Sequence, residues 1–205
     1  MKFERVSAYP DAILPTRATE KAAGYDLYAA EDTVIPSYWV MMQKLEQASV
    51  PEDAIFALFG MKEFKFKYQD ITEALKDEQF KDYRPTLVPT GIKIYLDDDK
   101  SFDIQARSSL PRKNWLIVAN APGLIDADYA NNPDNEGHIF VQLINLAPFP
   151  FTIKKGEKFA QGVIRQYFTV DNDTHGGERI GGFGSTDKIF TKEEFAPNLF
   201  IKDPS

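Results

Sequence analysis

The segment Gly123-Leu124-Ile125-Asp126-Ala127-Asp128-Tyr129 places a carboxylate after a short apolar stretch and an aromatic ring three positions later. On a strand that leads into a turn, Asp126 would point into a pocket that Tyr129 helps to wall. A half-buried carboxylate in such a pocket is suited to act as a general base that activates water. An isolated turn aspartate more often bonds its own backbone, so the segment needs support from the rest of the chain.

Short apolar stretches broken by Gly and Pro lie on both sides of this segment. Residues 1–36 predict short strands with turn residues at Pro10, Pro15, Gly24 and Pro36. Further strands are expected at 87–88, 92–96, 102–105, 139–144, 149–153 and 159–168. Gly162 is expected to break the last of these. Many short strands with turn signals between them favour an all-β sandwich or barrel.

The middle of the chain has a different pattern. From residue 38 to about residue 84 the apolar residues follow helical spacing, which predicts a helical insertion within a β domain. We favour a packing elaboration on a loop, because surface loops tolerate insertions at little cost, over a surface for a protein partner. The β domain is thus expected over 1–175, interrupted at about 38–84, with a glycine-rich arm and tail over 176–205.

Composition excludes several kinds of site. The 205 residues include no cysteine and only two histidines, which rules out thiolate chemistry and makes a Ser-His-Asp triad hard to build. A formal net charge of −7 argues against direct nucleic-acid binding. No stretch has the length of a membrane span, so no membrane association and a cytoplasmic location are expected.

Four further segments, in fixed order around Asp126, complete a pattern. They are Ala23-Gly24-Tyr25-Asp26-Leu27, Arg107-Ser108-Ser109-Leu110, Gly156-Glu157-Lys158-Phe159-Ala160-Gln161 and Gly181-Gly182-Phe183-Gly184-Ser185-Thr186. Together the five segments resemble the ordered motifs of the trimeric dUTPase family, over residues 1–36 and about 86–187. The resemblance implies a distorted β-barrel or jelly-roll-like subunit and a homotrimer whose active sites are shared between chains. The insertion is compatible with a phage-type member.

The resemblance also implies an activity. Members of the family hydrolyse dUTP to dUMP and pyrophosphate with Mg²⁺, which limits uracil in DNA and supplies dUMP for dTMP synthesis. The cytoplasm, or the host cytoplasm for a phage-encoded protein, is the expected location. Asp126 matches the general base for the water that attacks the α-phosphorus, and Asp26 matches the acid that orients Mg²⁺-bound water. The ion itself would be held mainly by the triphosphate.

Base and sugar recognition map onto the central segment and its surroundings. Tyr129 matches the ring that packs against deoxyribose and leaves no space for a 2′-hydroxyl. Asn120 matches the amide that reads the uracil edge, together with backbone groups near Phe140. The remaining residues expected to bind substrate in this segment are Gly123, Leu124 and Ile125.

Phosphate recognition maps onto three of the other motifs. Arg107, Ser108, Ser109 and Gln161 match phosphate-binding positions, where hydroxyls and turn N–H groups suit phosphate oxygens. Arg107 could instead be a structural ion-pair residue, and Gln161 an exposed strand residue. The arm is expected to close over the nucleotide, with Phe183 on uracil. Its other expected contacts, with the outer phosphates, are Arg179, Gly184, Ser185 and Thr186.

The sequence departs from the family pattern at several points. Ser109 stands where the family usually has Gly, which suggests a changed turn geometry. Arg179 lies one residue closer to the glycine pair than in many members. Residues 130–135 lengthen the hairpin after Tyr129, and the chain continues past Thr186. His138 and His175 match no functional position and are expected on the surface.

Two other functions are compatible with the sequence. A dCTP deaminase-like enzyme shares the fold, but it would need a catalytic Glu and a different base-reading segment. A repressor-binding regulatory protein on the same scaffold would use the insertion at 38–84 as its protein contact. The two roles of hydrolase and regulator can coexist in one chain.

Overall fold

The structure is a computed structural model that describes residues 1–40, 43 and 84–174. Its strands, in chain order, are β1 (Lys2–Arg5), β2 (Thr16–Arg17), β3 (Tyr25–Tyr28), β4 (Thr33–Ile35), β5 (Thr86–Pro89), β6 (Ile92–Tyr95), β7 (Lys100–Ala106), β8 (Leu116–Val118), β9 (Gly123–Ile125), β10 (Phe140–Asn145), β11 (Phe151–Ile153) and β12 (Lys158–Gln166). The short helix α4 (Ser109–Asn114) follows β7, and the 3-10 helix η2 (Ala127–Tyr129) follows β9. The described part of the chain is mostly β, as predicted.

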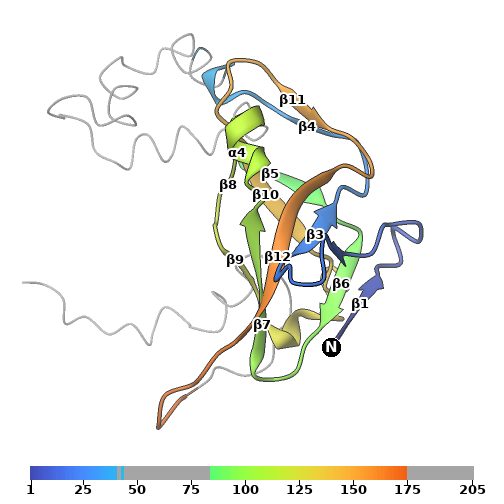
Figure 1. The fold of residues 1–205 in the computed structure, drawn as a ribbon, viewed down its shortest axis with the longest axis vertical. Coiled ribbons are helices and arrows are strands. Elements are labelled where there is room, and N and C mark those ends of the chain that lie inside the picture. Colours follow the sequence, from blue (N-terminus) through green and yellow to red (C-terminus); the bar gives the residue numbers. More distant parts are fainter. Residues whose placement is uncertain (41–42, 44–83, 175–205) are drawn as a thin grey trace, which may run out of the picture.

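The strands pair antiparallel in four sheets. The largest has the order β2-β3-β12-β7-β9, and a second has the order β5-β10-β8; β1 pairs with β6 and β4 with β11. Figure 1 shows β12 passing through the middle of the molecule between β3 and β7. Since β3, β7, β9 and β12 carry or adjoin four of the five motifs, one sheet gathers segments that are far apart in the sequence.

Alternation along the strands builds the core between the sheets. On β7, Phe102 and Ile104 are buried in the core, as the predicted apolar–polar alternation requires. Asp103 faces the other side and is also buried, where its carboxylate pairs with Arg165 at 2.8 Å. The polar face of this strand is therefore covered by charged partners.

Gly162 does not break the last strand, contrary to the prediction. β12 runs unbroken through it, and Gly162 pairs with Ile104 of β7 on one side and Tyr25 of β3 on the other. A Cβ at this position would lie 2.0 Å from Cζ of Phe102. The glycine is there because the Phe102 ring occupies the place of a side chain.

Two strands that are neighbours in the sequence separate at Gly91. β5 pairs with β10, whereas β6 pairs with β1. Gly91 has φ +69°, and a Cβ there would lie 2.6 Å from Cβ of Ala12. The chain therefore passes from one sheet into another at Gly91.

The predicted insertion begins where the described chain becomes helical, at residues 38–40. Ser37 and Trp39 hold this entry by side-chain hydrogen bonds to the carbonyls of Ala147 (2.6 Å) and Leu146 (3.0 Å). The remainder of the predicted helices, apart from residue 43, lies outside the described residues. Within residues 1–40, 43 and 84–174 there is no helix long and apolar enough to span a membrane.

Candidate active site

Asp126 occupies the position between β9 and η2. β9 pairs with β7 so that Ile125 lies opposite Phe102, and the chain then turns into η2. The Asp126 backbone is extended (φ −83°, ψ 162°), and its half-buried side chain makes no capping hydrogen bond to η2. The placement off a strand end agrees with the expectation from the sequence. The extended backbone is typical of an N-cap residue, but the Asp126 side chain makes no capping hydrogen bond to η2.

Asn120 and Gly123 lie against each other. A Cβ on Gly123 would lie 3.4 Å from Nδ2 and 3.5 Å from Oδ1 of Asn120. The exposed Asn120 amide therefore lies within ordinary van der Waals contact of residue 123. The Ala119 N–H donates to the Gln142 carbonyl at 2.9 Å, which brings the next residue, Asn120, to the backbone edge of β10 near Phe140.

Tyr129, at the end of η2, is 7% exposed. Its hydroxyl donates to the His138 carbonyl (3.2 Å) and accepts from Nδ2 of Asn135 (2.9 Å). The hydroxyl is therefore engaged by the protein. Leu124 and Ile125, the other predicted contacts, are exposed and half-buried respectively on β9.

A charged cluster stands at the other end of the large sheet. The Asp26 carboxylate is buried on β3, with Oδ1 3.1 Å from Nε of Arg107 and Oδ2 2.9 Å from Nζ of Lys158. Arg107 also donates to the Lys158 carbonyl at 3.0 Å. The hydrogen bond and charge of Asp26 raise the pKa of Lys158. Two cations around one carboxylate leave this cluster with net positive charge, which suits polyphosphate.

Gln161 joins this cluster through the pairing of β12. It lies opposite Asp26 on β3 and opposite Gln105 on β7. Its Nε2 donates to the Ala106 carbonyl at 3.2 Å, and a Cβ on Gly24 would lie 3.0 Å from its Oε1. The side chain is half-buried, so the alternative of a merely exposed strand residue does not hold.

Ser108 and Ser109 begin α4. Ser108 is exposed, stands at the N-cap and makes no side-chain capping hydrogen bond, while Ser109 is the first helical residue. Ser109 is not among the described residues with positive φ. Helical backbone accepts serine without strain, so the departure from the usual glycine requires no unusual turn.

The predicted site residues form two groups that one chain does not bring together. Ile125 pairs with Phe102, so the next residue, Asp126, lies beside the start of β7. Arg107 directly follows the end of the same strand. The seven residues of β7 make it roughly 20 Å long at about 3.3 Å per residue. The Asn120 amide also lies on the Ile104 face of the sheet, while Gln161, paired with Gln105, faces the opposite side.

Two features were not foreseen from the sequence. His138, expected on the surface, is 5% exposed and accepts a hydrogen bond from the Gly91 N–H at its Nε2 (2.9 Å). Burial lowers its pKa to about 4, so the ring is a neutral acceptor at pH 7. Lys158 lies in the motif at 156–161 but was not predicted to be a site residue. Its spacing from Gln161 within that motif was the signal that the sequence offered.

The part of the chain that the structure describes contains no cluster of three or more His, Cys, Asp or Glu suited to a metal ion. Both oxygens of Asp26 already contact cations, so direct coordination of Mg²⁺ would compete with Arg107 and Lys158. A carboxylate has further lone pairs that can accept from metal-bound water. The residues therefore fit an ion carried by the substrate and contacted through water.

Several predictions fall outside the described residues. These are the helices of the insertion and the arm, with His175, Arg179, Phe183, Gly184, Ser185 and Thr186.

Comparisons with known proteins identify the family of the chain. A family profile described as dUTPase matches residues 70–186. The deoxyuridine 5'-triphosphate nucleotidohydrolase of Lactococcus lactis is 35% identical over 188 residues, 90% of this chain and 95% of that protein. The chain belongs to the dUTPase family. The protein of the same name from Rickettsia felis is 38% identical over 154 residues, 72% of this chain and 95% of that protein.

Solved structures give the same result for the fold. The dUTPase from Streptococcus mutans matches with a TM-score of 0.60 and 32% identity, covering 84% of this chain and 100% of that one. The dUTPase from phage phi11 of S. aureus matches with a TM-score of 0.54 and 15% identity, covering 85% of this chain and 96% of that one. The predicted dUTPase fold is confirmed. The likeness to the phage protein concerns the fold alone, so the phage-type assignment stays a prediction.

Proposed function

We propose that this dUTPase hydrolyses dUTP to dUMP and pyrophosphate with Asp126 as the general base. The Asp126 carboxylate takes a proton from water, the water oxygen forms a bond to the α-phosphorus, and the bond from that phosphorus to the bridging oxygen breaks. Pyrophosphate leaves with the electron pair of that bond. Family membership supports the activity over a dCTP deaminase-like reaction, and the half-buried position of Asp126 at a strand end supports its role.

The observation that carries the proposal is the division of the site residues into two groups. Asp126 and Arg107 belong to opposite ends of β7, yet the reaction needs a base and phosphate ligands around one substrate. Closed symmetric association solves this, because a repeated heterologous interface places one group of each chain beside the other group of its neighbour. This supports active sites shared between chains, and the resemblance to trimeric dUTPases sets the number of chains at three.

Asn120, Tyr129 and the backbone near Phe140 would bind the nucleoside. Asn120 offers both a donor and an acceptor to the uracil edge, and its exposed amide lies beside Gly123 on the strand that leads to Asp126. Cytosine presents the opposite pattern and would leave polar groups unpaired, which is costly. Tyr129 would stand against the sugar and exclude a 2′-hydroxyl.

The neighbouring chain would supply the residues that bind the phosphates, which are Arg107, Ser108, Ser109 and Gln161. The positive balance of the Asp26 cluster and the exposed Ser108 at the start of α4 support this. Asp26 would accept hydrogen bonds from the water shell of Mg²⁺. When bound, that ion supplies neutralisation of phosphate charge, which favours attack by the water.

The C-terminal arm would complete the site. The family match extends to residue 186 and so includes Arg179, Phe183, Gly184, Ser185 and Thr186. Phe183 would stack on uracil, an interaction worth about 1–3 kcal/mol for a base on an aromatic ring. Truncation after Thr174 is expected to leave nucleotide binding and to lower turnover strongly, measured as pyrophosphate release beside the melting temperature.

The decisive assay follows pyrophosphate release from dUTP, dCTP, dTTP and UTP with Mg²⁺, beside ammonia release from dCTP. Strong preference for dUTP, abolished by chelation of the metal, is expected. Ammonia release from dCTP without pyrophosphate release from dUTP would overturn the proposal.

A further inference from the structure

The hairpin after Tyr129 folds back onto that residue. Nδ2 of Asn135 donates to the Tyr129 hydroxyl (2.9 Å), and the same hydroxyl donates to the His138 carbonyl (3.2 Å). The phenol oxygen is thus held from two sides by residues six and nine positions later. A buried ring that is bonded at its far end cannot tilt without breaking one of these bonds.

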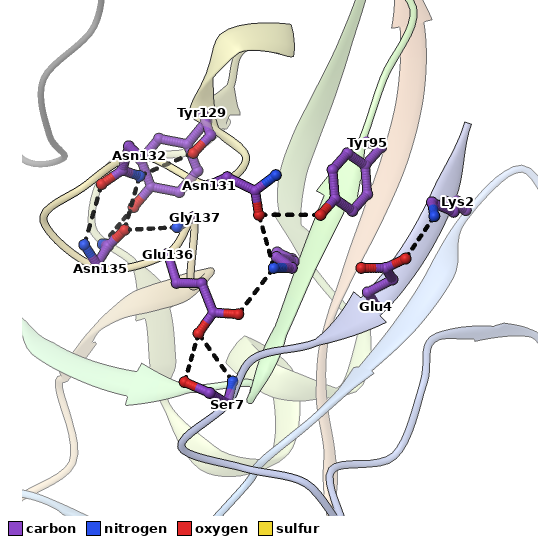
Figure 2. Close-up of polar contacts among 11 residues, drawn as sticks. Lys2, Glu4, Ser7, Tyr95, Tyr129, Asn131, Asn132, Asn135, Glu136 and Gly137 are labelled. Carbon is purple, nitrogen blue, oxygen red and sulfur yellow. Dashed lines mark hydrogen bonds and ion pairs between the residues drawn. The ribbon is translucent and has the colours of Figure 1, made fainter.

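Asn132 sets the position of Asn135. Its Nδ2 donates to Oδ1 of Asn135 (2.8 Å) and to the Tyr129 carbonyl (2.8 Å), while its own Oδ1 accepts from the N–H groups of Asp134 and Asn135. Oδ1 of Asn135 also accepts from the Gly137 N–H at 3.0 Å. Figure 2 shows these side chains converging on Tyr129. The Asn135 amide is therefore oriented by bonds to both of its ends.

The backbone of the hairpin at Gly137 also lies close to the backbone of Tyr129 and Ala130. Gly137 has φ +80°, and a Cβ there would lie 2.7 Å from Cα of Ala130 and 2.8 Å from the Tyr129 carbonyl oxygen. Only glycine allows the returning chain to lie directly on Tyr129.

A second set of bonds fastens this hairpin to the edge formed by β1 and β6. Oε1 of Glu136 pairs with Nζ of Lys93 at 2.8 Å, and its Oε2 accepts from the N–H and hydroxyl of Ser7. These hydrogen bonds lower the pKa of Glu136 to about 2. Figure 2 shows Ser7 and Glu136 joined on one side of the network and Asn131 reaching Tyr95 on the other. The hairpin is therefore anchored to the body of the domain.

We propose that Asn135 is a positioning residue that sets the discrimination between deoxyribose and ribose through Tyr129. The inference rests on the proposed function, in which the Tyr129 ring faces the sugar. The lengthening of the hairpin, residues 130–135, supplies the two asparagines that hold this ring. A ring that excludes a single oxygen atom must keep its place within a fraction of an ångström, since a small displacement opens the space for the 2′-hydroxyl.

The test measures kcat/KM for dUTP and for UTP in Asn135→Ala, with the melting temperature recorded beside it. We expect the dUTP/UTP ratio to fall about five-fold, the size that loss of one neutral hydrogen bond implies. Asn135→Asp keeps the acceptor for Gly137 and replaces the donor to Tyr129 by a carboxylate that can accept from the Tyr129 hydroxyl, so it should keep the ratio nearer to the wild-type value than Asn135→Ala does.

The matched control is Asn131→Ala. Asn131 lies in the same hairpin, and its side-chain oxygen accepts from Lys93 and Tyr95 of β6. It should lower the melting temperature and leave the ratio unchanged. Equal changes of the ratio in the Asn131 and Asn135 variants would overturn the assignment, because the hairpin as a whole would then be responsible.

Tyr129 variants separate this inference from the function on which it rests. Tyr129→Phe removes the bonds to both Asn135 and His138, so it should lower the ratio at least as much as Asn135→Ala does. Adding Asn135→Ala to Tyr129→Phe should lower the ratio no further, because the bond to Asn135 is already absent. Additive effects would overturn the inference. An unchanged ratio in Tyr129→Ala would show that the sugar is selected elsewhere and would overturn the role of Tyr129 as well.

Discussion

Two elements, β9 before it and η2 after it, set the position of Asp126. β9 holds the preceding residue opposite Phe102, and η2 begins directly after Asp126, so the carboxylate stands at a corner and not within a strand face. A group at such a corner is half-buried, which keeps it accessible to water while limiting its solvation. This is the environment in which a carboxylate acts as a base.

Asp126→Asn keeps the shape of the side chain and removes the proton acceptor. We expect turnover of dUTP to fall by about 10²–10⁴-fold with nucleotide binding retained, as for loss of a general base. Steady-state pyrophosphate release and a binding titration measure the two effects. Asp128→Asn is the matched control, since Asp128 is an exposed carboxylate two residues away. Near-normal turnover of Asp126→Asn would remove Asp126 from the mechanism.

His138 makes stability depend on pH. Its ring is buried between Tyr9 and Phe140, with centroids 5.2 Å and 4.0 Å away, and Nε2 accepts from Gly91. Burial lowers the pKa from 6.5 to about 4, so the folded state resists protonation. Stability from this group is fully present above pH 6.5 and is lost as the pH falls toward 4.

His138→Gln is expected to flatten this dependence, because the glutamine amide oxygen can still accept from Gly91 but does not titrate. Between pH 6.5 and 4 the wild-type free energy of unfolding should fall on the order of 2 kcal/mol more than that of the variant. Urea unfolding at several pH values measures the difference. Parallel curves for the two proteins would show that His138 is not the titrating group.

At the scale of the elements, Gly162 and Phe102 join β12 to β7. The Phe102 ring is fully buried and lies where a side chain on residue 162 would stand, so the two strands fit only with glycine there. Gly162→Ala is expected to destabilise the fold by about 1–3 kcal/mol or more through overpacking. Gly24→Ala is the control, since its Cβ would meet only the movable end of the Gln161 side chain. Thermal unfolding compares them, and equal melting temperatures would contradict the packing argument.

Strands were predictable from the sequence, but their partners were not. The alternation around Phe102 depends on neighbouring residues, and it is present. The sheet to which each strand belongs depends on pairings between distant segments, and β5 and β6 part at Gly91 for that reason. His138 was misassigned to the surface because its partner, Gly91, lies 47 positions away.

The candidate site shows the same limit. The ordered motifs predict Asp26, Arg107 and Asp126 as site residues, and Asn120 by its distance from Asp126, because each prediction rests on a local pattern. Strand register decides which of these residues meet: Gln161 lies opposite Asp26, whereas Ile125 opposite Phe102 places Asp126 away from them. The bonds of Asn135 to Tyr129 were also beyond prediction, because they depend on the path of the hairpin.

At the scale of the whole molecule, one chain leaves apolar surface uncovered beside β8. Trp115 is 63% exposed and Leu146 is 38% exposed, and the two are joined by a hydrogen bond from the Leu146 N–H to the Trp115 carbonyl at 3.0 Å. Exposed apolar groups that cluster favour contact with another protein surface. In the proposed homotrimer, association of copies of this chain would bring the two groups of site residues together, and this apolar region is a candidate for the surface that is covered.

Subunit complementation tests the shared site directly. Asp126→Asn and Arg107→Ala are each expected to be inactive, because each lacks one half of the machinery. If Asp126 of one chain serves the same site as Arg107 of its neighbour, mixed trimers contain sites with both native residues. When equal amounts of the two variants mix at random, the chain that supplies Asp126 is native at that position in about half of the sites, and so is the chain that supplies Arg107. About a quarter of the sites should therefore have both native residues. Co-expression with two affinity tags, tandem purification and pyrophosphate release measure the recovery.

The control mixes Asp126→Asn with Asp126→Ala, which cannot restore the base in any arrangement. Recovery in the first mixture and none in the second requires that the base and the phosphate ligands come from different chains. No recovery in either, from trimers shown by sedimentation to be mixed, would mean that both groups act within one chain. That result would require β9 or the end of β7 to move by much of the roughly 20 Å that the strand spans, against the antiparallel register that joins them.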